Sequence, residues 1–185
     1  MAIRLTLLCH ARLAGRPGIG FPADDPIDGT AFPASGVTLD RFDRLWTAPE
    51  LRARQTAQAL APNTVVIESL RDVDYGSWQG RSLDEIFRDD PQAASAWLSD
   101  PEAAPHGGES LAACLHRIGD WLDRHESTGH TVAITHPAVI RAAVVHCLGA
   151  PPQAFWRLDI EPLSAADLRR NAGRWTLRSV GPTGR

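Results

Sequence analysis

The apolar positions of this chain fall into short runs that alternate with longer segments of helical spacing. Short apolar runs bounded by turn residues are typical of buried strands. They predict strands at residues 3–9, 45–47, 64–68 and 131–135, with two edge strands at Trp156–Ile160 and Trp175–Val180. Several of these runs are followed directly by polar residues, so the strand ends are the first places to look for chemistry.

The longer segments repeat apolar residues at the spacing of helices that bury one face. They are residues 49–60, 83–98 with a break at Pro91, a segment from Ser110 that ends before Gly129, and 137–148. Pro49 and Pro137 suit first helical turns, and Gly149 followed by Pro151 suits a helix end. Residues 15–35 and 101–108 are rich in Gly, Pro and Asp or Ala, which predicts loops.

Strands that alternate with helices predict an α/β fold, a three-layer αβα sandwich with a mainly parallel central sheet. The 185 residues fit one domain that spans 1–185. With 43% hydrophobic residues, the chain has the composition of an ordinary soluble globule.

The charge balance argues against strongly anionic binding partners. The formal net charge is −3, and all 19 basic residues are arginine. Without a basic field, neither nucleic acid nor an anionic membrane surface is an expected partner. No apolar run is long enough for a membrane span or a signal peptide. The three cysteines, Cys9, Cys114 and Cys147, form no close pair, which argues against disulfides and structural zinc and favours a reducing cytoplasm.

Two histidines stand where predicted strands end. His10 follows Leu5 to Cys9, and His136 follows Val132 to Thr135. In an open parallel sheet the carboxyl ends of the strands face the ligand crevice, so these imidazoles can converge on one site. Between them, Arg52 lies near the start of a predicted helix, where positive charge and helix dipole favour an anion. Together these residues predict a phosphate pocket.

The ordered motifs resemble those of the histidine phosphatase superfamily, also called the phosphoglycerate mutase-like family. That family opens with Arg-His-Gly after its first strand, where this chain has Cys9-His10-Ala11. Its Ser-Pro-Leu-x-Arg-Ala-x-Gln-Thr-Ala is similar to residues 48–57, APELRARQTA. Its Leu-x-Glu-x-x-x-Gly-x-x-x-Gly corresponds to residues 70–80, its Gly-Glu-Ser to residues 108–110, and its His-Gly-x-x-Arg to residues 136–141.

The resemblance implies a role for each matched residue. His10 is the nucleophile that becomes phosphorylated, and Arg52 and His136 hold the phosphate. Asp72 falls on the family's proton donor, with Glu109 as a second candidate. These roles agree with the chemistry, because attack by a neutral imidazole needs nearby cations, and the leaving oxygen needs a proton.

Cys9 is the main departure from the family pattern. It replaces an arginine that contacts the phosphate, a charge-assisted bond worth roughly 1.5 to 3 kcal/mol. We count Cys9 and the neighbouring Arg12 among the substrate-contacting positions, since Arg12 is a cation that can fill the gap. A cysteine-based phosphatase is excluded by spacing, because the Cys-x5-Arg loop of that chemistry would place Gly15 at the arginine position.

These observations predict a phosphomonoester hydrolase that acts through a phosphohistidine on a small phosphate ester, without metal or organic cofactor. Two alternatives stay open. One is an inactive or weak anion-binding protein of the same fold, which the loss of the first arginine favours. The other is transfer of the mutase type, for which the chain is short between its first motifs and the acid. The sequence identifies neither the natural substrate nor the oligomeric state.

Overall fold

The computed structural model describes residues 3–15, 20–32, 37 and 39–183, and it centres on a six-stranded sheet. The strands are β1 (Ile3–Cys9), β2 (Arg44–Thr47), β3 (Val65–Val66), β4 (Gly129–Thr135), β5 (Ser164–Asn171) and β6 (Arg174–Pro182). Their order across the sheet is β3-β2-β4-β1-β5-β6. The first four pair in parallel, whereas β5 and β6 are antiparallel to their neighbours. The sheet is therefore mainly parallel, as the sequence predicted.

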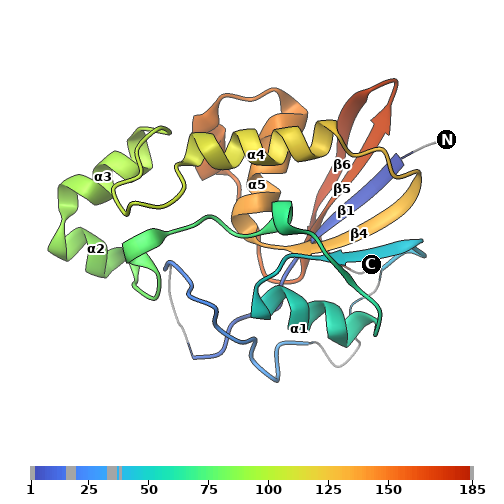
Figure 1. Cartoon of the computed structure of the whole chain (residues 1–185), viewed down its shortest axis with the longest axis horizontal. Coiled ribbons are helices and arrows are strands. Elements are labelled where there is room, and N and C mark those ends of the chain that lie inside the picture. The colour runs from blue at the N-terminus through green and yellow to red at the C-terminus, as the bar shows by residue number, and fades with distance from the viewer. Residues whose placement is uncertain (1–2, 16–19, 33–36, 38, 184–185) are drawn as a thin grey trace.

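Helices cover both faces of the sheet. They are α1 (Leu51–Leu60), α2 (Leu83–Asp89), α3 (Pro91–Ser99), α4 (Leu111–Asp123) and α5 (Pro137–Leu148). Figure 1 shows α1 below the sheet and α4 and α5 above it, with α2 and α3 extending beyond the sheet at one end. This arrangement is the predicted three-layer sandwich.

The two central strands owe their position to their apolar side chains. Leu5, Leu7 and Leu8 of β1 and Val132 and Ile134 of β4 have no exposed surface. A parallel strand buried on both faces needs a continuous apolar run of this kind. Because His10 and His136 come directly after these strands, burial of the strands fixes the positions of both histidines.

Local signals set the helix boundaries. Ser110 accepts a hydrogen bond at its hydroxyl from the N–H of Ala113, 3.1 Å away, and so caps α4. Helix α5 begins at Pro137 and ends at Leu148, and Gly149 caps it with φ +57°. Asp90 caps α3 directly before Pro91, so the predicted break at Pro91 is confirmed.

The sequence was wrong about one strand and missed another. Trp156–Ile160 is not a strand, because residues Pro152–Arg157 form a 3₁₀ helix. The strand that pairs with β1 is β5, where Ser164, Ala166 and Leu168 point inward and the residues between them outward. This alternation uses small residues and produces no apolar run. The edge strand predicted at Trp175–Val180 is confirmed within β6, and the predicted strand 64–68 shrinks to β3 followed by a 3₁₀ turn.

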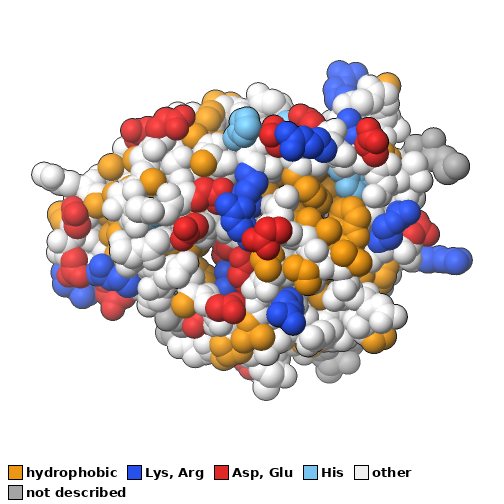
Figure 2. Space-filling view, viewed as in Figure 1, with side chains coloured by type: hydrophobic (Ala, Val, Ile, Leu, Met, Phe, Trp, Pro, Cys, Tyr) orange, Lys and Arg blue, Asp and Glu red, His pale blue; other side chains and the backbone are white. Residues whose placement is uncertain are grey.

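The surface matches the modest net charge. On the face seen in Figure 2, acidic and basic side chains are interspersed. No helix in the described part of the chain is long and apolar enough to cross a membrane. The predicted loop 15–35 lies partly outside the described residues.

Candidate active site

His10 presents one free ring nitrogen at the end of β1. Its Nδ1 lies 2.8 Å from the carbonyl oxygen of Ala11, and a carbonyl only accepts, so Nδ1 carries the proton. The lone pair is then on Nε2. Burial, followed by the proximity of His136, lowers the pKa of His10 to about 3, so the ring is neutral at physiological pH. A neutral imidazole with a fixed tautomer is the form that a nucleophile needs.

His136 and Arg52 form a hydrogen-bonded pair beside His10. The Nε–H of Arg52 donates to Nδ1 of His136 across 3.1 Å. Since an arginine only donates, the proton of His136 is on Nε2, which lies 2.7 Å from Oε2 of Glu50. The rings of His10 and His136 are 5.3 Å apart between centroids. The structure thus brings together the two histidines and the arginine that the sequence predicted to converge.

Glu50 is a member of this cluster that sequence reasoning missed. Its Oε2 accepts from His136, and its Oε1 accepts from the backbone N–H of Asp72 at 2.9 Å. Burial alone would raise the pKa of Glu50. The hydrogen bond from His136, the electrostatic interaction with His136 and the hydrogen bond from the Asp72 amide together lower the pKa to about 2. The signal in the sequence was a glutamate at a motif position where the family has leucine.

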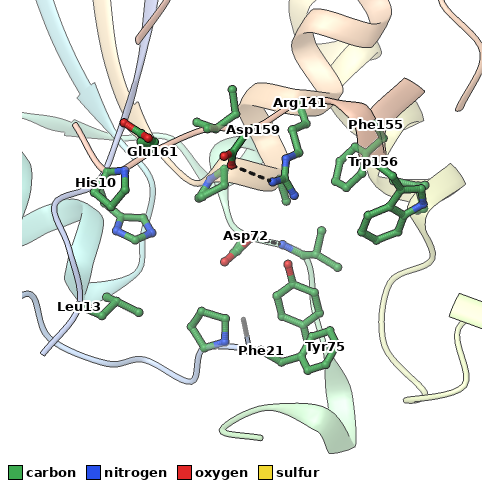
Figure 3. Close-up of a pocket in the computed structure, with 18 of the residues that line it drawn as sticks. His10, Leu13, Phe21, Asp72, Tyr75, Arg141, Phe155, Trp156, Asp159 and Glu161 are labelled. Carbon is green, nitrogen blue, oxygen red and sulfur yellow. Dashed lines mark hydrogen bonds and ion pairs between the residues drawn. The ribbon is translucent and has the colours of Figure 1, made fainter. Parts of the chain in front are cut away.

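Asp72 connects this cluster to the cavity. Its Oδ2 accepts from an Nη of Arg52 at 2.6 Å, and its Oδ1 accepts from the N–H of Val73 at 2.9 Å. Figure 3 shows its carboxylate near the centre of the pocket residues, with Tyr75 below it. Asp72 therefore lies between the buried cluster and the cavity that it lines.

Close packing of two chain segments holds Asp72 in place. A Cβ on Gly76 would lie 2.2 Å from the carbonyl oxygen of His106, and a Cβ on Gly108 would lie 2.0 Å from the carbonyl oxygen of Asp74. Only glycine permits so close an approach of two backbones. The N–H of Glu109 donates to Asp74 O at 2.8 Å, which ties the segments together. The glycines of two separate motifs thus meet at one contact.

All three donor groups of Arg52 are engaged by the protein. Besides His136 and Asp72, the carbonyl oxygen of Ala23 accepts from its other Nη at 2.7 Å. The side chain is 2% exposed, and that of His136 is fully buried. Both were predicted to line an anion-sized pocket, but they lie behind its wall. Asp72 occupies the position between Arg52 and the cavity.

The cavity itself has a volume of about 510 Å³ and is lined by His10, Asp72 and Arg141 among other residues. Arg141 extends from α5 toward Asp159, 3.9 Å away, and its guanidinium lies 5.6 Å from the centre of the Phe155 ring. Arg141 is the arginine of the motif at residues 136–141, and the structure places it on the cavity wall. It is a cation that faces the ligand space.

The other three residues that the sequence placed near the substrate differ in their position relative to the cavity. Arg12 lines the cavity and pairs with Asp28 at 2.8 Å, with its side chain 63% exposed. Glu109 does not line the cavity, because its carboxylate accepts two hydrogen bonds of 2.7 Å from Arg117. Cys9 is fully buried in the core and is not on the cavity wall. Burial raises the pKa of its thiol far above the ordinary value.

Among the described residues, no group of three or more His, Cys, Asp or Glu side chains could hold a metal ion.

Residues 34–183 match the family model described as the histidine phosphatase superfamily, branch 1. The chain belongs to the histidine phosphatase superfamily. The match begins after His10, so the assignment of the nucleophile rests on the geometry given above and on the Cys9-His10-Ala11 motif.

Two bacterial proteins are similar to this chain in sequence. A bifunctional protein of Mycobacterium tuberculosis is 33% identical over 149 residues, which cover 75% of this chain and 40% of that protein. Phosphoserine phosphatase 1 of Hydrogenobacter thermophilus is 28% identical over 139 residues, 71% of this chain and 66% of the relative. This chain therefore spans less than half the length of the first of these relatives.

A solved structure of the superfamily shares the whole fold. The native structure of a mycobacterial glucosyl-3-phosphoglycerate phosphatase superposes with a TM-score of 0.81 over 100% of both chains, at 23% identity. A likeness at this identity shows the common fold.

Proposed function

We propose that this chain is a phosphomonoester hydrolase that transfers the phosphoryl group of a small-molecule ester to His10 and then to water. The observation that carries the proposal is the neutral His10, with Nε2 unprotonated and facing a cavity of about 510 Å³. The names of the relatives support it, since phosphoserine and glucosyl-3-phosphoglycerate are small phosphate esters.

The first step forms a bond between Nε2 of His10 and phosphorus and breaks the bond from phosphorus to the alcohol oxygen. Positive charge near the transferring group stabilises its transition state. Arg141 supplies such charge from the cavity wall, and Arg52 supplies it from behind Asp72. In the second step water attacks phosphorus, the N–P bond breaks, and inorganic phosphate leaves.

Asp72 is the proposed acid of the first step and base of the second. Its carboxyl group lines the cavity together with His10. As the acid, Asp72 donates a proton to the departing alcohol. In the second step the resulting carboxylate takes a proton from the attacking water. Glu109 has no such access, because Arg117 holds it elsewhere.

Asp72→Asn tests this assignment through the leaving group. Hydrolysis of alkyl phosphates should slow by about 10²- to 10⁴-fold, the usual contribution of a general acid. Hydrolysis of nitrophenyl phosphate should slow far less, because nitrophenolate leaves without a proton. Equal losses in kcat/KM for both substrates would remove Asp72 from the role.

A specific observation favours a second candidate function. Each of the three nitrogens of the Arg52 guanidinium already donates to a protein acceptor, and Cys9 leaves no guanidinium at the family's first position. A protein with this arrangement could bind an anionic metabolite without turning it over. Such a binding protein would carry no phosphate on His10.

Purified protein assayed against a panel of phosphomonoesters separates the two candidates. The hydrolase should release inorganic phosphate and carry a transient label that is stable in base and labile in acid, as phosphohistidine is. His10→Ala should abolish both, whereas His116→Ala, at an exposed position on α4, should change neither. Ligand binding without release or label would establish the binding protein instead.

We also propose that the protein works in a reducing compartment such as the cytoplasm. Cys9, Cys114 and Cys147 are free thiols, and the first two are buried. Full activity in the presence of a thiol reductant is the expected result, and inactivation by reductant would contradict it.

A further inference from the structure

Five aromatic side chains form one wall of the candidate active-site cavity. They are Phe21, Tyr75, Trp97 and the adjacent pair Phe155 and Trp156. Figure 3 shows Phe155 and Trp156 beyond Arg141, on the side away from His10, and Phe21 and Tyr75 below Asp72. The cavity therefore has a polar end, where His10 and Asp72 lie, and an aromatic end.

The aromatic wall is continuous. Ring centroids are 5.1 Å apart between Phe21 and Tyr75, 6.3 Å between Tyr75 and Trp97, and 6.1 Å between Trp97 and Trp156. Phe155 lies 5.0 Å from Trp156. These are the separations of aromatic rings in mutual contact. Phe21, Trp97 and Phe155 are at most 6% exposed, but Trp156 is 37% exposed. The wall is thus held by packing, and Trp156 is its most exposed ring.

The size of the cavity leaves room beyond the phosphoryl group. Sites for small molecules span roughly 300 to 1,000 Å³ and are lined mainly by apolar and aromatic side chains with a few polar groups. At about 510 Å³ this cavity falls in that range. With the phosphorus next to His10, the alcohol part of an ester would extend along the aromatic wall.

The cavity also offers polar partners to the alcohol part of an ester. Asp159 and Glu161 line it, and the Asp159 side chain is 91% exposed and lies 3.9 Å from Arg141. Hydroxyl and amino groups of the alcohol can donate hydrogen bonds to these carboxylates.

We propose that the cavity selects a phosphomonoester of a primary alcohol that carries a flat aromatic ring, of the size of a nucleoside 5′-monophosphate. The ring stacks on the wall that ends at Trp156, while the phosphoryl group meets His10. This proposal rests on the hydrolase activity proposed above and adds the substrate class to it.

A matched pair of substrates tests the proposal. Adenosine 5′-monophosphate and methyl ribofuranoside 5-phosphate share the sugar and the leaving alcohol and differ in the aromatic base. Stacking of a base on an aromatic side chain is worth about 1 to 3 kcal/mol. The ratio of kcat/KM for the two esters should therefore be about 5 to 150 in favour of the adenosine ester.

Trp156→Leu should lower this ratio by about fivefold or more. The ratio compares two substrates on one protein, so it cancels any general loss of activity in the variant. Trp121→Leu is the matched control, because Trp121 lies on α4 against Trp46 and does not line the cavity. The control should keep the wild-type ratio.

The outcomes separate this proposal from the activity on which it rests. Turnover of both esters at similar kcat/KM, or a ratio that Trp156→Leu leaves unchanged, overturns the aromatic subsite and leaves the hydrolase in place. If neither ester is turned over, calorimetry with adenosine 5′-monophosphate decides. Binding that Trp156→Leu weakens supports the subsite and overturns the hydrolase, and absence of binding overturns both.

Discussion

The buried polar cluster and the cavity wall lie next to each other but differ in how their polar groups are hydrogen-bonded. In the cluster of Glu50, Arg52, Asp72 and His136, each side chain has hydrogen-bond partners within the protein. On the cavity wall, the polar groups are few and the lone pair on Nε2 of His10 faces the ligand space. Arg52 and His136 are thus hydrogen-bonded within the protein, while His10 lines the cavity.

This difference bears on which part of a substrate, the phosphate or the alcohol, contributes more to its binding free energy. A phosphate can reach Arg52 only by competing with Asp72, whose carboxylate already holds an Nη of Arg52. Contacts on the apolar wall carry no such competition, because burying aromatic surface only displaces water. The cluster therefore favours discrimination by the alcohol part of the ester over tight binding of the phosphate.

The largest expected effect is the loss of stability on replacing Arg52. Arg52→Ala removes the cation that pairs with the buried carboxylate of Asp72 and the hydrogen-bond donor to Nδ1 of His136, which should lower the free energy of unfolding by about 3 to 5 kcal/mol. Urea denaturation at pH 7 measures the loss. Arg12→Ala removes an arginine of the cavity wall whose partner, Asp28, lies at the surface, and it should cost less than about 1 kcal/mol. Similar losses in the two variants would show that the cluster is not a closed electrostatic unit.

Acid should act on His10 with a smaller effect. Its pKa is lowered to about 3 from 6.5 by burial and by His136. Between these pH values the unfolded chain takes up a proton that the folded protein does not, so stability is complete above about pH 6.5 and is lost as the pH falls toward 3. Between pH 7 and pH 5 this residue should account for about 1 to 2 kcal/mol of lost stability.

Urea denaturation of His10→Gln at the two pH values isolates this share. The variant should lose less stability than the wild type over the same interval, and His116→Gln should lose as much as the wild type. Glu50 has no part in this interval, because its lowered pKa of about 2 makes its contribution present above pH 4.5 and lost only in stronger acid. Equal slopes for the wild type and His10→Gln would show that His10 is not held neutral.

The smallest expected effect is the change in kcat/KM on replacing Cys9, which tests whether this residue contacts the substrate. Because its thiol is buried and does not line the cavity, Cys9→Ala should change kcat/KM by less than about twofold, or roughly 0.4 kcal/mol. Cys114→Ala, another buried cysteine, is the control for general loosening of the core. A tenfold loss confined to Cys9→Ala would return Cys9 to the substrate-contacting residues.

Much of the fold was predictable from the sequence because its signals are local. The apolar runs of β1 and β4, the prolines at residues 49, 91 and 137, and Gly149 each act within a few residues. Strand β5 escaped prediction because its inward positions are Ser164, Ala166 and Leu168, which become core only through pairing with β1. Its identity is a property of the assembled sheet.

The candidate site divides in the same way. His10, Arg52, Asp72 and His136 were found because each stands in an ordered motif, and the structure brings them together. Which of them faces the ligand could not be predicted, since burial of Arg52 depends on Ala23, a residue 29 positions earlier in the chain. Glu50 and Arg141 likewise gained their places from contacts between distant segments.

The contact between Gly76 and Gly108 limits how this protein can be redesigned. The two backbones meet so closely that a methyl group on either glycine would collide with a carbonyl oxygen. A loop exchanged upstream of Gly108 to change substrate preference therefore has to keep both glycines and the path of the chain at His106. Libraries that vary residues 101–105 and leave this crossing untouched should return far more folded variants than libraries that vary the crossing itself.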